Sequence, residues 1–373
     1  MGSRVQVVGG GVIGLACAWE LARNGHAVTV VAPDPGGDGA SWVAAGMLAP
    51  VTEAQFGESA LTTLLLAGAG RWPAFAAALE AASGLPIGYD TTGTVTVALN
   101  ASDRASLDDL LAYQHTLGLE ASRRSASECR RLVPALSPAL RGGIEVPGDH
   151  QVDNRALLAA LLEACRRAGA TFVAGTVLAL ADGPALVLAD GRRLAADHVV
   201  LAAGTGLPAI DGLADAALPS LRPVKGHILR LGPADTAGAV PLLARTVRGL
   251  VHGRSIYLVP RRDGSVVVGA TVEERGTDTA VRAGAVHELL CDARSIVPAI
   301  DELELLEAAT GLRPATPDNT PRIGWTRRDG VLAAAGHYRN GILLAPLTAA
   351  AVVDLLERRP VPPLLEALAP VPA

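Results

Sequence analysis

The N-terminal segment constrains the fold of this chain more than any other stretch. Residues 4–34, RVQVVGGGVIGLACAWELARNGHAVTVVAPD, predict a buried strand, a glycine turn, a helix and a second strand. Gly9, Gly11 and Gly14 form a G-x-G-x-x-G pattern in that turn. The first glycine permits the tight turn, the second lets a pyrophosphate approach the backbone, and the third lets the helix pack on the strand. With a strand before it and a helix and strand after it, the pattern predicts a dinucleotide-binding βαβ unit.

The end of the second strand departs from the usual form of such a unit. An acidic side chain commonly stands there and holds the ribose hydroxyls of the adenosine, whereas this chain has Ala32. The nearest acid is Asp34, and two interpretations stay open. Either Asp34 reaches the ribose through a displaced turn, or backbone groups and water make the contact. The spacing of the glycines is compatible with both NAD and FAD.

Two later segments favour a flavin. Residues 39–50, GASWVAAGMLAP, are mostly small and follow neither a helical nor a strand period, so we expect a loop whose backbone approaches a flat cofactor. Residues 197–206, DHVVLAAGTG, predict a buried strand that ends in Ala-Ala-Gly. In flavoproteins with two dinucleotide-binding motifs, such a strand passes close to the cofactor.

Composition argues against several other classes of protein. The chain has 373 residues, half of them hydrophobic and 18% charged, which is enough for two domains with substantial cores. The net charge is −5 and no basic tract occurs, so we expect no nucleic-acid or membrane partner. No apolar stretch reaches the roughly 18 residues of a membrane span, and the first strand begins too early for a signal peptide. The four cysteines match no metal spacing, and we expect free thiols, a cytoplasmic location and no metal.

An arginine near the C-terminus stands in an unusual setting. Residues 336–346, GHYRNGILLAP, place Arg339 directly before an almost wholly apolar run. A buried cation without a counter-charge is very costly. Arg339 is therefore expected to meet an anion.

Five segments together resemble the glycine oxidases, which belong to the D-amino-acid oxidase group of FAD-dependent amine oxidases. They are the glycine turn, ASWVAAGMLAP, YLVPRRDGSVVVGAT (257–271), GLRPATPDNTPRIG (311–324) and GHYRNGILLAP, and the resemblance extends from about residue 4 to about residue 357. It implies an oxidase that uses FAD and O2, produces H2O2 and serves bacterial thiamine biosynthesis. No cysteine in these segments is placed for the covalent flavin of the sarcosine oxidases, so we expect non-covalent FAD.

The resemblance also implies the fold, an α/β protein that is α+β overall. A Rossmann-like FAD-binding domain would be discontinuous, and a substrate domain with an antiparallel sheet would be inserted into it. We place the first domain at residues 1–90, 146–220 and 308–373, and the second at 91–145 and 221–307.

Local patterns agree with this architecture. Alternation in residues 92–99 and a hairpin around Arg262-Asp263-Gly264 predict antiparallel strands. Residues 154–170 predict a helix with Asn154 as its N-cap and Gly169 near its end.

Three side chains are implied to act on a small amino-acid substrate. By the matching segments, Arg313 would clamp the substrate carboxylate and Tyr257 would donate a further hydrogen bond to it. Arg339 would lie beside the flavin, and the anion it meets would be the same substrate carboxylate. A guanidinium suits this task because its fork makes two parallel charge-assisted hydrogen bonds. The residues implied to bind FAD are Gly9, Gly11, Val12, Ile13, Gly14, Asp34, Ala40, Ser41, Ala45, Gly46, Met47, Val177, His337, Tyr338, Arg339, Asn340, Gly341, Ile342 and Leu343.

Several positions allow more than one interpretation. His337 either packs against the flavin or hydrogen-bonds it, and Lys225 either faces the flavin or forms a structural salt bridge. Ser255 and Val272 stand where family members can have histidine and methionine, which leaves the size of the pocket open.

Other functions remain possible from sequence alone. They are a D-amino-acid dehydrogenase with a quinone acceptor, a sarcosine-oxidase-like amine oxidase, and a flavin-binding subunit of a complex. By family resemblance we expect a homo-oligomer, for which a tetramer is one assembly that the resemblance allows.

Overall fold

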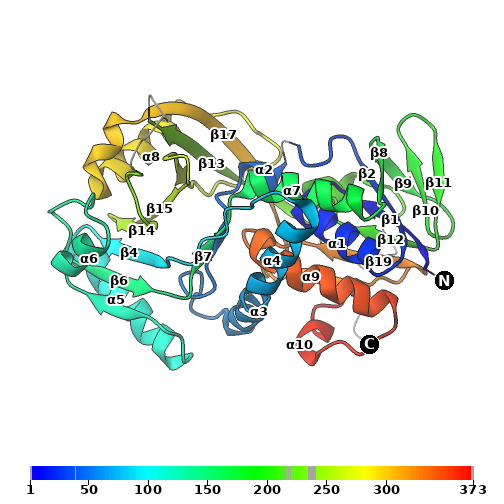
Figure 1. The fold of residues 1–373 in the computed structure, drawn as a ribbon, viewed down its shortest axis with the longest axis horizontal. Coiled ribbons are helices and arrows are strands. Elements are labelled where there is room, and N and C mark those ends of the chain that lie inside the picture. Colours follow the sequence, from blue (N-terminus) through cyan, green and yellow to red (C-terminus); the bar gives the residue numbers. More distant parts are fainter. Residues whose placement is uncertain are drawn as a thin grey trace.

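Two large sheets lie in opposite halves of the molecule (Figure 1). The structure is a computed structural model that describes residues 2–37, 39–213, 216, 218, 220–233 and 241–370. The first sheet has the order β18 (Arg322–Trp325), β19 (Val331–Ala335), β12 (His198–Leu201), β1 (Arg4–Val8), β2 (Ala27–Ala32) and β8 (Thr171–Ala174). The second has the order β17 (Glu304–Ala315), β13 (Arg222–Gly232), β16 (Val266–Gly269), β15 (Arg254–Pro260), β14 (Thr246–Val251), β4 (Thr94–Ala98), β6 (Gly143–Val146) and β5 (Ser122–Arg124).

The first sheet is parallel except for its edge strand β18, which runs antiparallel to β19. Strand β1 lies at its centre, with Val7 opposite Val30 of β2 and Val200 of β12. All three valines are fully buried, as expected for a parallel sheet covered on both faces. The predicted βαβ unit is therefore confirmed.

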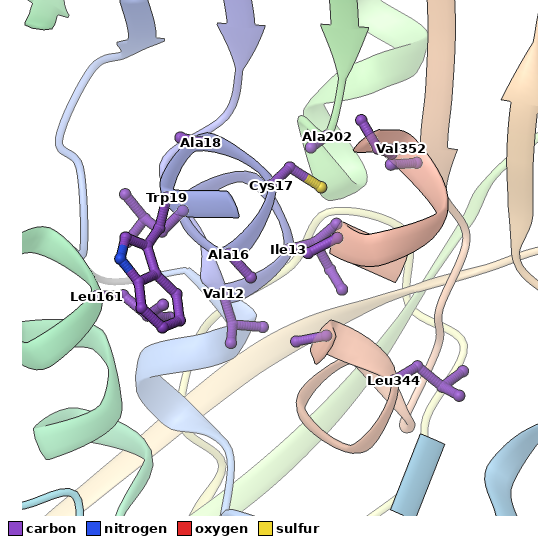
Figure 2. Packing of buried hydrophobic residues seen from close by; sticks show 14 of the residues in the cluster. Val12, Ile13, Ala16, Cys17, Ala18, Trp19, Leu161, Ala202, Leu344 and Val352 are labelled. Carbon is purple, nitrogen blue, oxygen red and sulfur yellow. The ribbon is translucent and has the colours of Figure 1, made fainter. Parts of the chain in front are cut away.

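Helix α1 (Val12–Arg23) connects β1 to β2 and forms the centre of the larger core. Figure 2 shows it end-on, with Leu161 of α7 (Asn154–Arg167) on one side and Leu344 of α9 (Gly341–Leu356) on the other. Ala16 and Ala18 are fully buried on α1, and such small side chains let neighbouring helices approach closely. Each large apolar side chain buried there contributes roughly 1.5–3 kcal/mol. Helices α3 (Ser59–Ala69) and α4 (Trp72–Ser83) extend the same core.

The second sheet is antiparallel apart from one parallel pair, β4 with β14. Strands β15 and β16 form the predicted hairpin, with Gly264 at φ 85° in its turn. Helices α8 (Ala283–Ile296) and α6 (Ala126–Leu132) pack against this sheet through a separate core. The expected combination of a parallel and an antiparallel sheet is confirmed.

Smaller elements complete the described chain. They are α2 (Ala40–Val43), α5 (Ala101–Thr116), α10 (Pro363–Glu366), the 3-10 helices Gly204–Ala209 and Pro298–Glu302, the pair β3 (Met47–Leu48) with β7 (His150–Gln151), and the sheet of β9 (Val177–Leu180), β10 (Ala185–Leu188) and β11 (Arg193–Ala195).

Two local predictions were wrong, the N-cap of α7 and the loop at residues 39–50. The N-cap of α7 is Asp153, whose carboxylate accepts from the backbone N–H groups of Arg155 and Ala156. Asn154 instead donates through Nδ2 to the carbonyls of Ser41 (2.9 Å) and Trp42 (2.7 Å). Those carbonyls belong to α2, so the segment expected to be a loop contains one turn of helix, followed by strand β3.

The domain boundaries stay a prediction. Strand β17 runs without interruption across residues 307 and 308, where we placed one of those boundaries.

Candidate functional site

The glycine turn after β1 depends on close backbone contacts. Gly9 has φ 115°, and a Cβ there would lie 2.3 Å from the carbonyl oxygen of Ala202. A Cβ on Gly14 would lie 2.0 Å from the carbonyl oxygen of Gly9. Both contacts are far below van der Waals distance, so only glycine lets α1 start this close to the strand. Gly14 thus acts in helix packing, the role expected of the third glycine.

The N-terminus of α1 is open to a ligand. The N-cap residue, Gly11, has no side chain to cap the helix, and the first turn contains no acidic residue. The N–H of Val12 donates to Oγ of Ser41 at 3.0 Å, while the other early N–H groups of a helix have no intrahelical acceptor. Such an end favours an anion through both hydrogen bonds and the helix dipole.

A cavity of about 1220 Å3 extends from this turn to the second sheet. Twenty of the residues singled out from the sequence line it: Gly9, Gly11, Val12, Ile13, Asp34, Ala40, Ser41, Ala45, Gly46, Met47, Val177, Tyr257, Arg313, His337, Tyr338, Arg339, Asn340, Gly341, Ile342 and Leu343. Gly14 does not line it. Ligand pockets usually span about 300–1,000 Å3, so this cavity has room for a dinucleotide and a small second molecule.

The C-terminal part of the cavity wall is the start of α9. Its N-cap is Asn340, and its first turn has neither a side-chain cap nor an acid. His337 is buried beside it, with Nε2 and Oγ1 of Thr348 2.9 Å apart. Burial lowers the pKa of His337 to about 3, so this imidazole is neutral at physiological pH. The N-terminus of α9, like that of α1, thus lies at the wall of this cavity without a capping side chain from its own N-cap residue.

Arg313 and Tyr257 approach the cavity from the second sheet. Arg313 lies on β17 opposite Val224, and Tyr257 lies on β15 opposite Gly269. A Cβ on Gly226 would lie 2.4 Å from the Arg313 guanidinium, and one on Gly269 would lie 2.5 Å from the Tyr257 hydroxyl. Both polar groups therefore rest over glycines on the neighbouring strands.

Tyr257 and Arg313 differ in their electrostatic surroundings. Burial raises the pKa of Tyr257, although the charges of Arg313 and Arg248 oppose that rise. Tyr257 is therefore a neutral hydrogen-bond donor at physiological pH. Nη1 of Arg313 donates to the Thr271 carbonyl at 3.2 Å. Among the residues that the structure describes, no carboxylate forms an ion pair with Arg313.

Arg339 has a counter-charge within the chain, and the sequence reasoning missed it. Its Nε lies 2.5 Å from Oε2 of Glu53, while Oε1 of Glu53 accepts from Nη1 of Arg248. Burial alone would raise the pKa of Glu53, but the charges of Arg248 and Arg339 outweigh burial and lower it. Glu53 comes three positions after the end of the segment ASWVAAGMLAP, so its place near a predicted cofactor segment was the available signal.

The comparisons with known proteins agree with this geometry. The model of the family DAO, FAD dependent oxidoreductase, matches residues 4–355. The chain belongs to this family.

Its relatives include a glycine oxidase of Geobacillus kaustophilus, 35% identical over 360 residues that cover 95% of this chain and 93% of that protein. A Rhizobium etli protein that carries the provisional name thiamine biosynthesis oxidoreductase is 34% identical over 355 residues, covering 95% of this chain and 96% of its own length. The crystal structure of the Geobacillus kaustophilus glycine oxidase matches with a TM-score of 0.90 and 34% identity, over 100% of this chain and 99% of that chain. The predicted resemblance to glycine oxidases is confirmed, and the cofactor of this family member is FAD.

The residues present fit that cofactor. A glycine turn that a single Cβ would fill, two uncapped helix ends and a long cavity suit a molecule with a pyrophosphate at one end and a flat ring system at the other. Ala32 is buried at the end of β2, and Asp34 lines the cavity on the turn that follows.

The remaining positions are placed as follows. Lys225 is fully buried, with Nζ 3.0 Å from Oδ2 of Asp278 and 2.6 Å from the Ala280 carbonyl, so it forms the structural salt bridge. Ser255 and Val272 both line the cavity.

The described residues contain neither a metal-ligating cluster nor a membrane-spanning helix. Within the described ranges, no cluster of three or more His, Cys, Asp or Glu side chains could hold a metal. No helix in that part of the chain is long and apolar enough to span a membrane.

Proposed function

We propose that this FAD-dependent oxidoreductase is an amino-acid oxidase that converts glycine, O2 and water to glyoxylate, ammonia and H2O2. The observation that carries the proposal is Arg313. It lines the cavity beside the Tyr257 hydroxyl, yet no described carboxylate pairs with it. A guanidinium without a counter-ion suits the carboxylate of a small substrate.

Three side chains of the protein would then bind and orient the substrate. Arg313 holds the substrate carboxylate with its fork, and Tyr257 donates one more hydrogen bond. Arg339 lies beside the substrate, at the end of the cavity formed by α9. Fixing the carboxylate at these points orients the Cα–H bond, and orientation of this kind contributes strongly to rate.

The chemistry that bound FAD would supply is acceptance of a hydride from Cα and transfer of the two electrons to O2. No side-chain base is required for that step, because the lone pair of the neutral substrate amine assists departure of the hydride. The glycine turn and the N-terminus of α1 would hold the pyrophosphate, and the start of α9 would face the flavin. Water then hydrolyses the imine to glyoxylate and ammonia.

Three further features belong to the proposal. FAD is held without a covalent bond, so acid precipitation should leave all yellow colour in the supernatant. The product serves thiamine biosynthesis, in line with the provisional name of the Rhizobium etli relative. The protein acts as a cytoplasmic homo-oligomer, which light scattering on the purified enzyme would test for its assembly.

One assay tests the reaction itself. Purified yellow protein is supplied with glycine, sarcosine or D-alanine, and both H2O2 and the oxo acid are measured. Glycine turnover with equal amounts of peroxide and glyoxylate supports the proposal. Turnover that needs a quinone and yields no peroxide would replace it with a dehydrogenase.

A further inference from the structure

Three guanidinium groups line the cavity, and two of them share one carboxylate. Arg248, Arg313 and Arg339 all reach it. Glu53 binds Arg248 through Oε1 and Arg339 through Oε2, so each of its oxygens serves a different arginine. Its side chain is only 11% exposed. Glu53 thus bridges two cations, while no carboxylate of the described residues forms an ion pair with the third, Arg313.

The backbone around Glu53 is fixed by a buried acid. Asp149 is fully buried and accepts from the N–H groups of Val51 and Thr52, both at 2.9 Å. It also accepts from Oγ1 of Thr52 at 2.5 Å, and that same Oγ1 lies 3.2 Å from Nη1 of Arg248. Glu53 is therefore held in place through the turn at residues 51–53 and through its partner Arg248.

Such an arrangement has a consequence for ligands. A carboxylate that lies between two arginines occupies the position that a second carboxylate of a ligand would need. Like charges at close range repel strongly in a partly buried site. An incoming dicarboxylate would meet Arg313 with one end and the negative Glu53 with the other.

We propose that Glu53 is a specificity-determining residue, whose carboxylate fills the anion position between Arg248 and Arg339 and so restricts the cavity to ligands with one carboxylate. The inference deepens the proposed function and rests on it, because it takes Arg313 as the open clamp. Glu53 acts here on the choice of substrate by excluding a second negative charge.

The first test uses the unaltered holoenzyme. Dissociation constants are measured from the change in flavin absorbance for matched pairs of acids: propionate with malonate, and butyrate with succinate. Within each pair only the second carboxylate differs. We expect the dicarboxylate to bind no more tightly than its partner. A dicarboxylate that binds about tenfold more tightly in the unaltered enzyme would overturn the inference.

The second test removes the charge and keeps the shape. In Glu53→Gln, Arg248 and Arg339 lose their shared anion. The affinity of the tighter-binding dicarboxylate, relative to that of its monocarboxylate partner, should therefore rise roughly tenfold or more. The same ligand should raise the melting temperature of this variant more than the monocarboxylate does. An unchanged ratio of dissociation constants would contradict the inference, even if activity falls.

Two control variants test whether the effect comes from the negative charge at residue 53 or from the net charge of the cavity. Glu53→Asp keeps the negative charge and should keep the preference for one carboxylate. Glu58→Gln removes the acid that lies 4.0 Å from Nη2 of Arg339 and does not contact Arg248. It should shift the ratio much less than Glu53→Gln. An equal shift in both Gln variants would point to net charge alone and would also overturn the inference.

A further variant distinguishes this inference from the proposed function. Arg313→Lys should weaken propionate binding in the otherwise unaltered enzyme. If propionate is indifferent to Arg313, the proposed clamp fails. If propionate depends on Arg313 while Glu53→Gln leaves the ratios unchanged, only the inference about Glu53 fails.

Discussion

The cofactor end and the substrate end of the cavity are built in different ways. The cofactor end consists mainly of backbone: the turn at Gly9, the uncapped start of α1 and the uncapped start of α9. The substrate end consists of charged side chains on strands and loops that are distant in sequence, among them Glu53 and Arg313. The geometry of a backbone site is determined by the positions of glycines in the sequence. The geometry of a side-chain site is determined by which charged residues the fold brings together. The first should tolerate almost no added atom at its glycines, and the second should be most sensitive to changes in charge and in hydrogen-bond geometry.

The largest effect is expected at Gly14. Gly14→Ala places a methyl group 2.0 Å from the Gly9 carbonyl, so either α1 or the turn must move. We expect the purified protein to lose most of its FAD, as measured by the ratio of flavin to protein absorbance. Gly25→Ala is the matched control, because Gly25 has φ 85° but no atom within 4 Å of the added Cβ. That variant should lose only about 1 kcal/mol of stability and keep its flavin. Equal flavin loss in both variants would show that the close contact at Gly14 does not decide whether FAD is retained.

The second prediction concerns the buried acid that fixes the loop at the substrate end. Burial raises the pKa of Asp149 to about 6 from an ordinary value near 3.8, although hydrogen bonds from Thr52 and Val51 limit the rise. Between about pH 4 and 6 the folded state keeps a proton that the unfolded state has released. The free energy of unfolding should therefore fall as the pH rises through this window, by about 3 kcal/mol from this group. Urea unfolding at several pH values measures it.

Asp149→Asn provides the comparison for that measurement. The variant is less stable overall, because its amide cannot accept every hydrogen bond that the carboxylate accepts. Its unfolding free energy should nevertheless lack the part of the pH slope that Asp149 contributes. The prediction is wrong if the slopes of the two proteins between pH 4 and 6 coincide.

The third prediction tests the substrate clamp. Arg313→Lys keeps the charge but removes the fork, and a hydrogen bond to a charged group contributes about 1.5–3 kcal/mol. We expect kcat/KM for glycine to fall roughly tenfold to a hundredfold, with a normal flavin content. Arg313→Ala should be worse, and Tyr257→Phe, which loses one neutral donor, should be mildest. An amine without a carboxylate serves as control, and its turnover should respond weakly. Equal losses for both kinds of amine would rule out the clamp.

The smallest effect is expected at Asp34. The ribose contact is one of many along FAD, so Asp34→Ala should leave the flavin content nearly unchanged. Apoprotein reconstitution with FAD, followed by fluorescence, would measure the affinity. A protein that is purified without flavin would instead assign the ribose contact to Asp34.

The two ends also differ in how far the sequence could predict them. Gly9, Gly11 and Gly14 lie within one short segment, and local periodicity on either side sufficed to predict strand, turn and helix. The hairpin of β15 and β16 followed for the same reason, whereas the full parallel sheet around β1 was implied by the resemblance to glycine oxidases. Charge pairing depends on long-range approach, which no local pattern encodes. The need of Arg339 for an anion was predictable, but Glu53 lies far from it in sequence, and the family segments indicated only the substrate.

The helix caps show the same limit at shorter range. Asp153 and Asn154 are adjacent, and both are good N-cap residues. The choice between them was decided by the carbonyls of Ser41 and Trp42, which lie more than a hundred positions earlier in the chain and accept from Asn154.

Asn154 also forms hydrogen bonds to both ends of the cavity through its one amide group. Its Nδ2 donates to the carbonyls of α2, and its Oδ1 lies 3.2 Å from Nη2 of Arg230 and 3.3 Å from Nη2 of Arg261, both on the side of the second sheet. Deamidation to aspartate would keep the acceptor and turn the donor into a second acceptor facing two carbonyl oxygens. Chemical ageing at this one side chain would therefore loosen α2 from α7 while leaving the arginines bound, and the damage would appear as loss of cofactor in a protein whose substrate sheet is still intact.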